Sequence, residues 1–228
     1  MVSSFCRSAT RRRTQAGFGR TEALVLFFVL ILAAVAIVAP FEGFLENSRL
    51  ARGVDCARTL STLLSQYSVD NNGTYPAGEG TSAPGKSEGI ALNLLQNNFT
   101  PDASVFAVGS TPAYSGKATD YSDLTAANMS WDFTAGANAT TGIPATAPDS
   151  LPIVYTTGQQ VTYPTTPDGT TSLPLTGNGP FGLKGMVVAY KNNSAQFISA
   201  ANTGAGPFCP GFFPPEFKDT TIYTQIKP

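Results

Sequence analysis

The sequence predicts an α+β protein in which a long N-terminal helix packs on a small antiparallel β-sheet domain with long loops. Apolar residues recur with a helical period up to residue 67, and short apolar or alternating runs typical of strands follow from residue 129 onward. Segments 109–150 and 165–180 are rich in Gly, Ala, Thr, Pro and Ser. Connections of this length are unusual in compact domains, so we expect them to be surface loops.

The N-terminal helix is expected to run from about residue 19 to residue 68, which is roughly 75 Å. Residues 23–41 contain no charged or polar side chain, and 19 residues of helix cover about 28 Å of the ~30 Å hydrocarbon core of a bilayer. Gly43 and Gly53 each disfavour the helix by about 1 kcal/mol relative to Ala, so local bends are expected there. Beyond the apolar run, one helix face carries an apolar stripe of Cys56, Leu60, Leu63, Leu64 and Tyr67.

Turn residues end this helix, and a shorter one follows. Residues 70–76 contain an Asn-Gly pair and Pro76, which are stop signals. Ser87 is a candidate N-cap for a helix that continues to Asn97. Its apolar residues are Ile90, Leu92, Leu94 and Leu95.

Several strands are expected in the remaining chain. Residues 129–133 alternate as a strand with one buried face does, with Trp131 in the core and Asp132 on the opposite face. The other predicted strands are residues 151–156, residues 161–163 with a turn at 168–169, and a hairpin of 186–190 and 195–199 around residues 191–194. Residues 204–228 hold five prolines, which predicts an ordered irregular tail wrapped on the domain.

Composition excludes several functions. Charged residues are 13% of the chain and the formal net charge is −1, which argues against nucleic acid as a partner. The sequence has no histidine, so it has no Ser-His-Asp or Cys-His relay and no His-ligated metal. Carboxylate and lysine chemistry remain open, so an enzyme that uses acid pairs is one alternative. We expect no catalytic residues and no cofactor, and a structural protein rather than an enzyme.

Charge at the N-terminus predicts a membrane orientation. Residues 1–17 carry four arginines and no acid, a charge of +4, whereas the remainder of the chain carries −5. Arginines before an apolar span leave residues 1–20 in the cytoplasm and export the rest. The sequence thus predicts a single-pass inner-membrane protein with an exported domain.

Three interpretations of the N-terminus compete. A secretory signal could be cleaved at residues 34–36, although the apolar run is longer than such signals have. An uncleaved anchor is the second interpretation. The third rests on the junction of residues 14–24, which reads TQAGFGRTEAL.

That junction resembles the processing site of type IV prepilins and type II secretion prepseudopilins. The resemblance implies a leader of residues 1–17 ending in Gly17, cleavage by a prepilin peptidase, and Phe18 as the methylated mature N-terminus. Glu22 would be the fifth mature residue, and Pro40 lies close to a proline common in the family. Gly19, Arg20 and Thr21 depart from the apolar or hydroxylic residues usual there. The Asn-Gly-x-Tyr-Pro segment of residues 72–76 also resembles one in major pseudopilins.

Glu22 has two interpretations. It could pair with its own α-amine or lie among lipid headgroups, because Phe18 and Glu22 share a helix face. Alternatively, it pairs with the α-amine of the next subunit and sets the axial register of a filament. The resemblance favours this second role.

The acidic residues of the exported part suggest no metal site. They are scattered, they do not form the calcium-loop pattern, and solvated loop carboxylates are expected. These residues are Asp120, Asp123, Asp132, Asp149 and Asp168.

Two cysteines remain after the predicted cleavage, because Cys6 lies in the leader. Cys56 and Cys209 are an even pair in an oxidising compartment, so a disulfide is one expectation and two free thiols are the other. The bridge would close a loop of about 150 residues, for which chain entropy predicts a stabilisation near 5 kcal/mol.

These predictions describe a pilin-like fold with three parts: the leader at 1–17, the helix at 18–68 and the exported domain at 69–228. The expected function is a structural subunit of a type IV pilus-like or type II secretion pseudopilus filament, in the inner membrane and then in a periplasmic or extracellular filament. Partners implied by the resemblance are the peptidase, other subunits, an assembly platform and a cytoplasmic ATPase. The alternative is a membrane-anchored periplasmic binding or interaction module that does not polymerise.

Overall fold

The computed structural model describes residues 19–116, 121, 123–164, 173–203, 206–217, 219 and 221–228, without the side chains of residues 32–43 and 203. The chain divides into two units, Met1–Leu45 and Glu46–Pro228. The helix α1 (Arg20–Asp70) contributes to both units. The second unit therefore takes in the last part of α1, whereas the predicted exported domain begins at residue 69.

The α+β class is confirmed in the second unit by a five-stranded antiparallel sheet in the order β5-β4-β2-β1-β8. Its strands are β1 (Trp131–Ala135), β2 (Pro152–Thr156), β4 (Gly185–Tyr190), β5 (Ala195–Ser199) and β8 (Thr224–Ile226). A smaller sheet in the order β3-β7-β6 consists of β3 (Leu173–Pro174), β6 (Ala201–Thr203) and β7 (Gly206–Cys209). The predicted hairpin is confirmed as β4 and β5.

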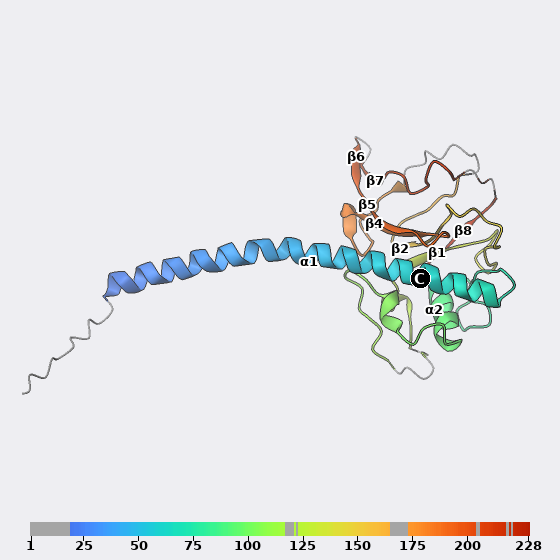
Figure 1. Ribbon diagram of the computed structural model, residues 1–228, viewed down its shortest axis with the longest axis horizontal. Coiled ribbons are helices and arrows are strands. Elements are labelled where there is room, and N and C mark those ends of the chain that lie inside the picture. The colour runs from blue at the N-terminus through green and yellow to red at the C-terminus, as the bar shows by residue number, and fades with distance from the viewer. Residues whose placement is uncertain are drawn as a thin grey trace, which may run out of the picture. The chain divides into compact units, whose positions relative to one another are not determined.

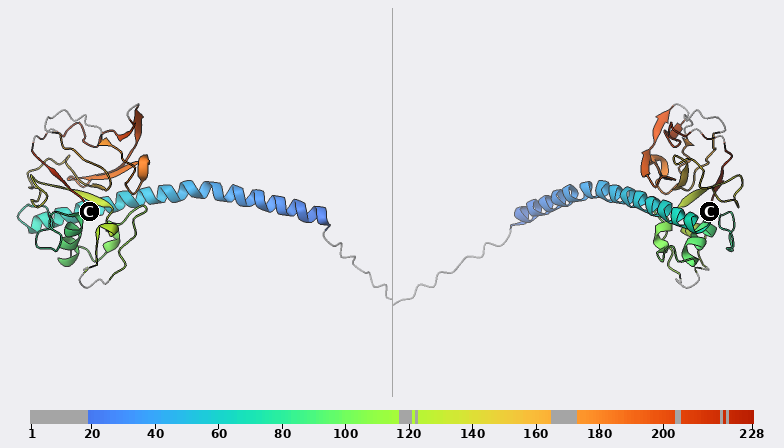
Figure 2. Two further views of the ribbon diagram at one scale, coloured as in Figure 1. Left: turned by 180° about the vertical axis from the view of Figure 1, so that it is seen from behind. Right: turned by 45° about the vertical axis from the view of Figure 1, so that its right-hand side comes forward.

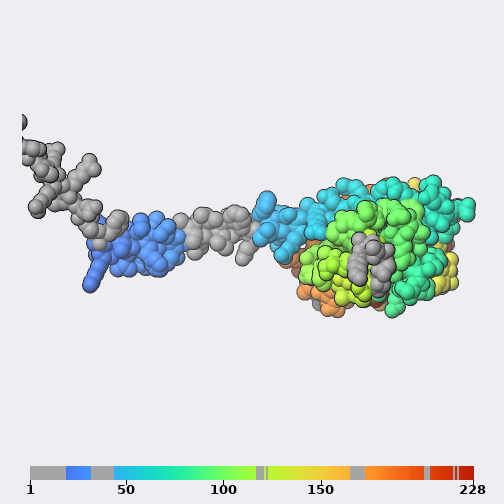
Figure 3. All heavy atoms as spheres, turned by 90° about the horizontal axis from the view of Figure 1, so that it is seen from below, coloured from blue at the N-terminus to red at the C-terminus, as the bar shows by residue number. Residues whose placement is uncertain are grey.

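Helices cover one face of the five-stranded sheet (Figures 1 and 2). Trp131 Nε1 donates to the carbonyl of Val105, which lies in the 3₁₀ helix η1 (Ala103–Phe106). On the same side, α1 approaches the hairpin turn, because the Ser61 hydroxyl donates to the carbonyl of Tyr190 at 3.0 Å. The space-filling view shows the green residues around α2 (Ser87–Gln96) closing over this side (Figure 3).

The C-terminal segment covers the opposite face. The ring of Phe212 meets that of Tyr155 edge-on at 5.3 Å, and Phe213 meets Tyr163 at 5.6 Å. Every residue of β1, β2 and β4 is buried. The prediction that residues 129–133 bury only one face is therefore wrong, since the tail supplies a second layer. The tail is also less irregular than predicted, because it contributes β7 and β8.

Three local predictions have mixed outcomes. The stop after residue 70 is confirmed, with Asn72 and Gly73 at positive φ and the Gly73 amide donating to the Ser68 carbonyl at 2.7 Å. The short helix is confirmed as α2, but Ser87 is its first residue and donates to the Ile226 carbonyl instead of capping the helix. Residues 161–163 form no strand, because the Val161 amide donates to the Gln225 side chain.

Gly53 does not interrupt α1. A Cβ built at this position would lie 2.8 Å from Cζ of Phe181 and 3.2 Å from Cγ2 of Val187. The glycine therefore allows close approach of the helix to β4, and the expected bend is not the reason for its presence. The apolar stripe is confirmed: Leu60, Leu63 and Leu64 are buried, and Cys56 and Tyr67 pack partly buried beside them.

Candidate assembly segment and polar pocket

The first turns of α1 combine a carboxylate with a continuous apolar surface. The Gly19 amide donates to Oε2 of Glu22 at 3.1 Å, so the carboxylate satisfies a backbone donor at the start of the helix. This capping bond within the chain was not predicted from the sequence. Gly17 and Phe18, the predicted processing residues, lie outside the described residues, as does the predicted leader.

Eight consecutive large apolar side chains follow, from Leu24 to Ile31. Their exposed fractions lie between 43% for Ile31 and 63% for Val25, so they point to solvent all round the helix. A shallow hollow of about 340 Å³ on this segment is lined by Thr21, Glu22, Val25, Leu26 and Val29. A helix that is apolar on every side is stable only when another apolar phase surrounds it.

Among the described residues, no helix is both long enough and apolar enough to cross a membrane. The predicted span of residues 23–41 includes ten positions whose side chains lie outside the described part of α1.

Cys56 and Cys209 are free thiols in the structure. Cys209 is buried and its thiol lies 3.6 Å from the carbonyl of Ile198, to which it donates. Cys56 is half-buried on α1, next to Arg52. Burial raises the pKa of both thiols, that of Cys209 to about 11. Of the two expectations for these residues, the structure contains the free thiols and not the bridge.

Asp132 is not the solvated loop carboxylate that was predicted. It lies in β1 with no exposed surface, and its Oδ2 accepts from Nε2 of Gln225 at 2.6 Å. Its Oδ1 has no hydrogen-bond partner. Burial raises its pKa to about 6. The side chains of Thr157 and Gln225 oppose this rise, because they stabilise the charged form. The polar position in an alternating strand was visible in the sequence, but the layer that buries it comes from residues about 80 positions further along the chain.

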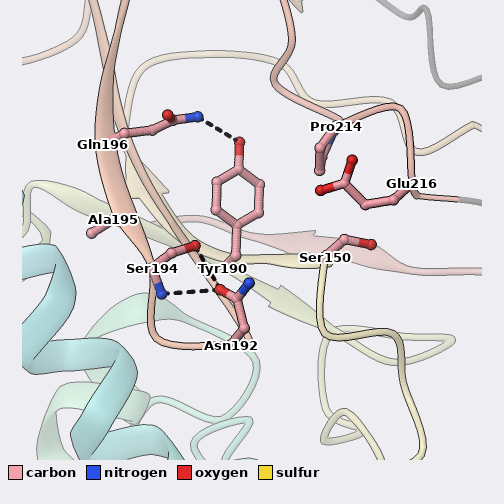
Figure 4. A pocket seen from close by; sticks show the side chains of 8 residues that line it. All are labelled: Ser150, Tyr190, Asn192, Ser194, Ala195, Gln196, Pro214 and Glu216. Atoms are coloured by element: carbon pink, nitrogen blue, oxygen red, sulfur yellow. Dashed lines mark hydrogen bonds between the residues drawn. The ribbon is translucent and has the colours of Figure 1, made fainter.

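A polar pocket of about 220 Å³ lies beside the β4–β5 hairpin (Figure 4). Ser194 donates from both its amide and its hydroxyl to Oδ1 of Asn192, and Gln196 donates to the Tyr190 hydroxyl at 3.3 Å. Burial raises the pKa of Tyr190 to about 12, so this phenol stays neutral at physiological pH. The pocket offers hydroxyl and amide groups and the Glu216 carboxylate, which suit a small polar ligand. None of its residues was singled out from the sequence as a site.

Metal ligands do not gather in the described part of the chain: no three His, Cys, Asp or Glu side chains there lie close enough to share an ion. Asp120 and Asp168 lie outside the described residues. Asp149 is an exposed loop acid whose carboxylate pairs with Lys191 at 2.9 Å.

Comparison with known proteins gives no relative: no family model, no curated protein and no solved structure matches this chain.

Proposed function

We propose that this chain is a structural subunit of a type IV pilus-like or type II secretion pseudopilus filament, built through its N-terminal helix. The observation that carries the proposal is the run of exposed apolar side chains from Leu24 to Ile31 directly after Glu22. Burial of apolar surface is favourable by about 25 cal/mol per Å². Such a segment is therefore much more stable in lipid or among copies of itself than in water. The pilin-like fold is part of this proposal.

Glu22 is the polar residue that would define the contact between subunits. A carboxylate among apolar helices costs several kcal/mol unless it is paired. In the single chain it caps the Gly19 amide, which leaves room for a further donor because a carboxylate accepts at two oxygens. The α-amine of a neighbouring subunit is the donor we propose.

During assembly, the chain would meet its partners in a fixed order. The chain would enter the inner membrane, lose residues 1–17 to a prepilin peptidase, and join other subunits on an assembly platform driven by a cytoplasmic ATPase. The exported domain would then face the periplasm or the outside of the filament. No cofactor and no enzymatic activity belong to this function.

The intact mass of the membrane-extracted protein tests processing. We expect loss of residues 1–17 with the addition of one methyl group. Gly17→Leu should leave the precursor uncut, because a side chain there obstructs an extended chain in a peptidase site. Gly19→Ala is the matched control, since a Cβ at Gly19 would meet its nearest neighbour only at 3.7 Å. Normal maturation of Gly17→Leu would contradict the cleavage site.

Substitution of Glu22 tests assembly. Glu22→Ala should be cleaved normally but should reduce filament yield at least tenfold, measured by shearing and immunoblotting. Glu22→Gln keeps a side chain that can accept from the Gly19 amide but removes the charge. If the Glu22→Gln variant assembled as well as the wild type, helix capping would explain Glu22, and the pair between subunits would be wrong.

The polar pocket of Figure 4 favours a second candidate, a membrane-anchored periplasmic binding or interaction module that does not polymerise. This alternative predicts an uncleaved leader and no filaments. The mass measurement separates the two functions, because the module would retain residues 1–17.

A further inference from the structure

The C-terminal strand β8 is joined to the sheet through a buried acid. Its three residues pair with β1 at the edge of the sheet. Gln225 makes the polar connections: its Nε2 donates to Asp132 Oδ2 at 2.6 Å and to the Gln159 carbonyl at 2.8 Å, while its Oε1 accepts from the Val161 amide at 3.0 Å. One side chain thus ties β8 to β1 and to the segment after β2.

The acid at the centre of this cluster is poorly prepared for a negative charge. Asp132 has no exposed surface and its Oδ1 lacks a hydrogen-bond partner. An ionised carboxylate in such a place is unstable, and hydration by water stabilises it. Towards β2, the way is closed by Tyr155, which lies directly opposite Asp132 and is fully buried. Towards β8, Thr224 and Gln225 are only half-buried.

We propose that the charge on Asp132 controls the pairing of β8 with β1. The neutral acid keeps the strand in place, and the ionised carboxylate makes it open more often. Both strands lie in the second unit, Glu46–Pro228, so the opening of β8 does not depend on filament assembly.

Among the titratable groups of this cluster, Asp132 is the one that titrates near neutral pH. Lys227, which follows β8, lowers the pKa of Asp132 by its positive charge and donates a hydrogen bond to Oε1 of Gln160. Burial raises the pKa of the phenols of Tyr155 and Tyr163, so both stay neutral. The chain has no histidine, the residue that usually titrates between pH 5 and 8.

The sign of the effect follows from linkage. Burial raises the pKa of Asp132 from 3.8 to about 6, so the closed form binds more protons than an open form in which the carboxyl is hydrated. Stability from the neutral acid is present at low pH and is lost as pH rises through 6. For a pKa of about 6 closed and an ordinary one open, the opening constant should rise about tenfold between pH 5 and pH 8.

Hydrogen exchange of the full-length protein in detergent tests this inference. After correction for intrinsic rates, amides of residues 224–226 should exchange about tenfold faster from the open state at pH 8 than at pH 5, whereas β4 amides should show no such change. Asp132→Asn should remove the pH dependence, and Asp123→Asn, which changes an exposed acid, should retain it. A flat wild-type profile, or equal slopes in β4 and β8, would overturn the proposal.

A second measurement covers the case in which Asp132→Asn does not fold. The Asp132 carboxyl of the wild-type protein is titrated by ¹³C NMR and compared with the exchange profile of β8. The two midpoints should coincide near pH 6. A carboxyl that titrates near pH 4, or midpoints that differ by about one pH unit or more, would show that Asp132 does not control the strand.

Discussion

Two eight-residue stretches of α1, residues 24–31 and 57–64, have opposite surroundings. Residues 24–31 are large apolar side chains, each at least 43% exposed. Residues 57–64 bury Ala57, Leu60 and Leu64 against the sheet and leave Arg58 on the outer side with its side chain 55% exposed. The second stretch finds its apolar partner within its own chain, whereas the first has none among the residues that the structure describes.

The difference lies in periodicity. In the second stretch apolar residues recur at helical spacing and polar residues occupy the other positions, so one stripe meets the domain. In the first stretch no polar position interrupts the run. Packing along one side of this helix would therefore leave the apolar side chains on its other sides exposed. Hydropathy alone marks only the first stretch, whereas the spacing of the apolar residues indicates that the second packs on the sheet.

Truncation of one leucine in each stretch should give the largest contrast. Leu60→Ala removes a side chain with no exposed surface and should lower the free energy of unfolding by about 2–5 kcal/mol. Leu26→Ala, at 53% exposure, should change it by less than about 0.5 kcal/mol. Urea unfolding of both full-length variants in detergent, followed by near-UV circular dichroism, measures this. Equal losses would mean that the two stretches do not differ in their partners.

Gly53→Ala should have an intermediate effect with an informative sign. On helix propensity alone the change should stabilise α1 by about 1 kcal/mol. The added Cβ would lie 2.8 Å from the Phe181 ring, so we expect a net loss of about 1 kcal/mol instead. In a Phe181→Leu background the same substitution should become neutral or stabilising. A gain in the wild-type background would show that the helix does not need its close approach to β4.

The ion pair between Lys184 and Glu46 should have the smallest effect. It joins η3 (Gly182–Lys184) to the first residue of the second unit, and the two side chains are 64% and 41% exposed. Exposed pairs contribute about 0–1 kcal/mol, and salt screens them. Glu46→Gln should cost less than about 1 kcal/mol at low salt and nothing measurable at about 1 M NaCl in the same unfolding assay. A salt-independent loss would indicate that Glu46 acts through packing.

Local features were predictable because the residues that form them are close in the chain. The stop after residue 70 depends on Asn72 and Gly73, which adopt positive φ, and the β4–β5 hairpin depends on two apolar runs four residues apart. The exposed apolar surface of residues 24–31 likewise follows from an uninterrupted apolar run in the sequence, whereas its role in assembly stays a proposal. The turn and the hairpin each depend on a short stretch of sequence.

The sequence by itself determined the class of fold, the ends of the helices, the apolar stripe of α1 and the absence of imidazole chemistry. Tertiary structure alone decided that the C-terminal segment covers the second face of the sheet, which buries Asp132 and brings Gln225 to its carboxylate. It also decided that Gly53 serves packing and that Cys56 and Cys209 stay unbridged. These outcomes depend on contacts between residues far apart in the chain, and no local propensity specifies which distant segment supplies the partner.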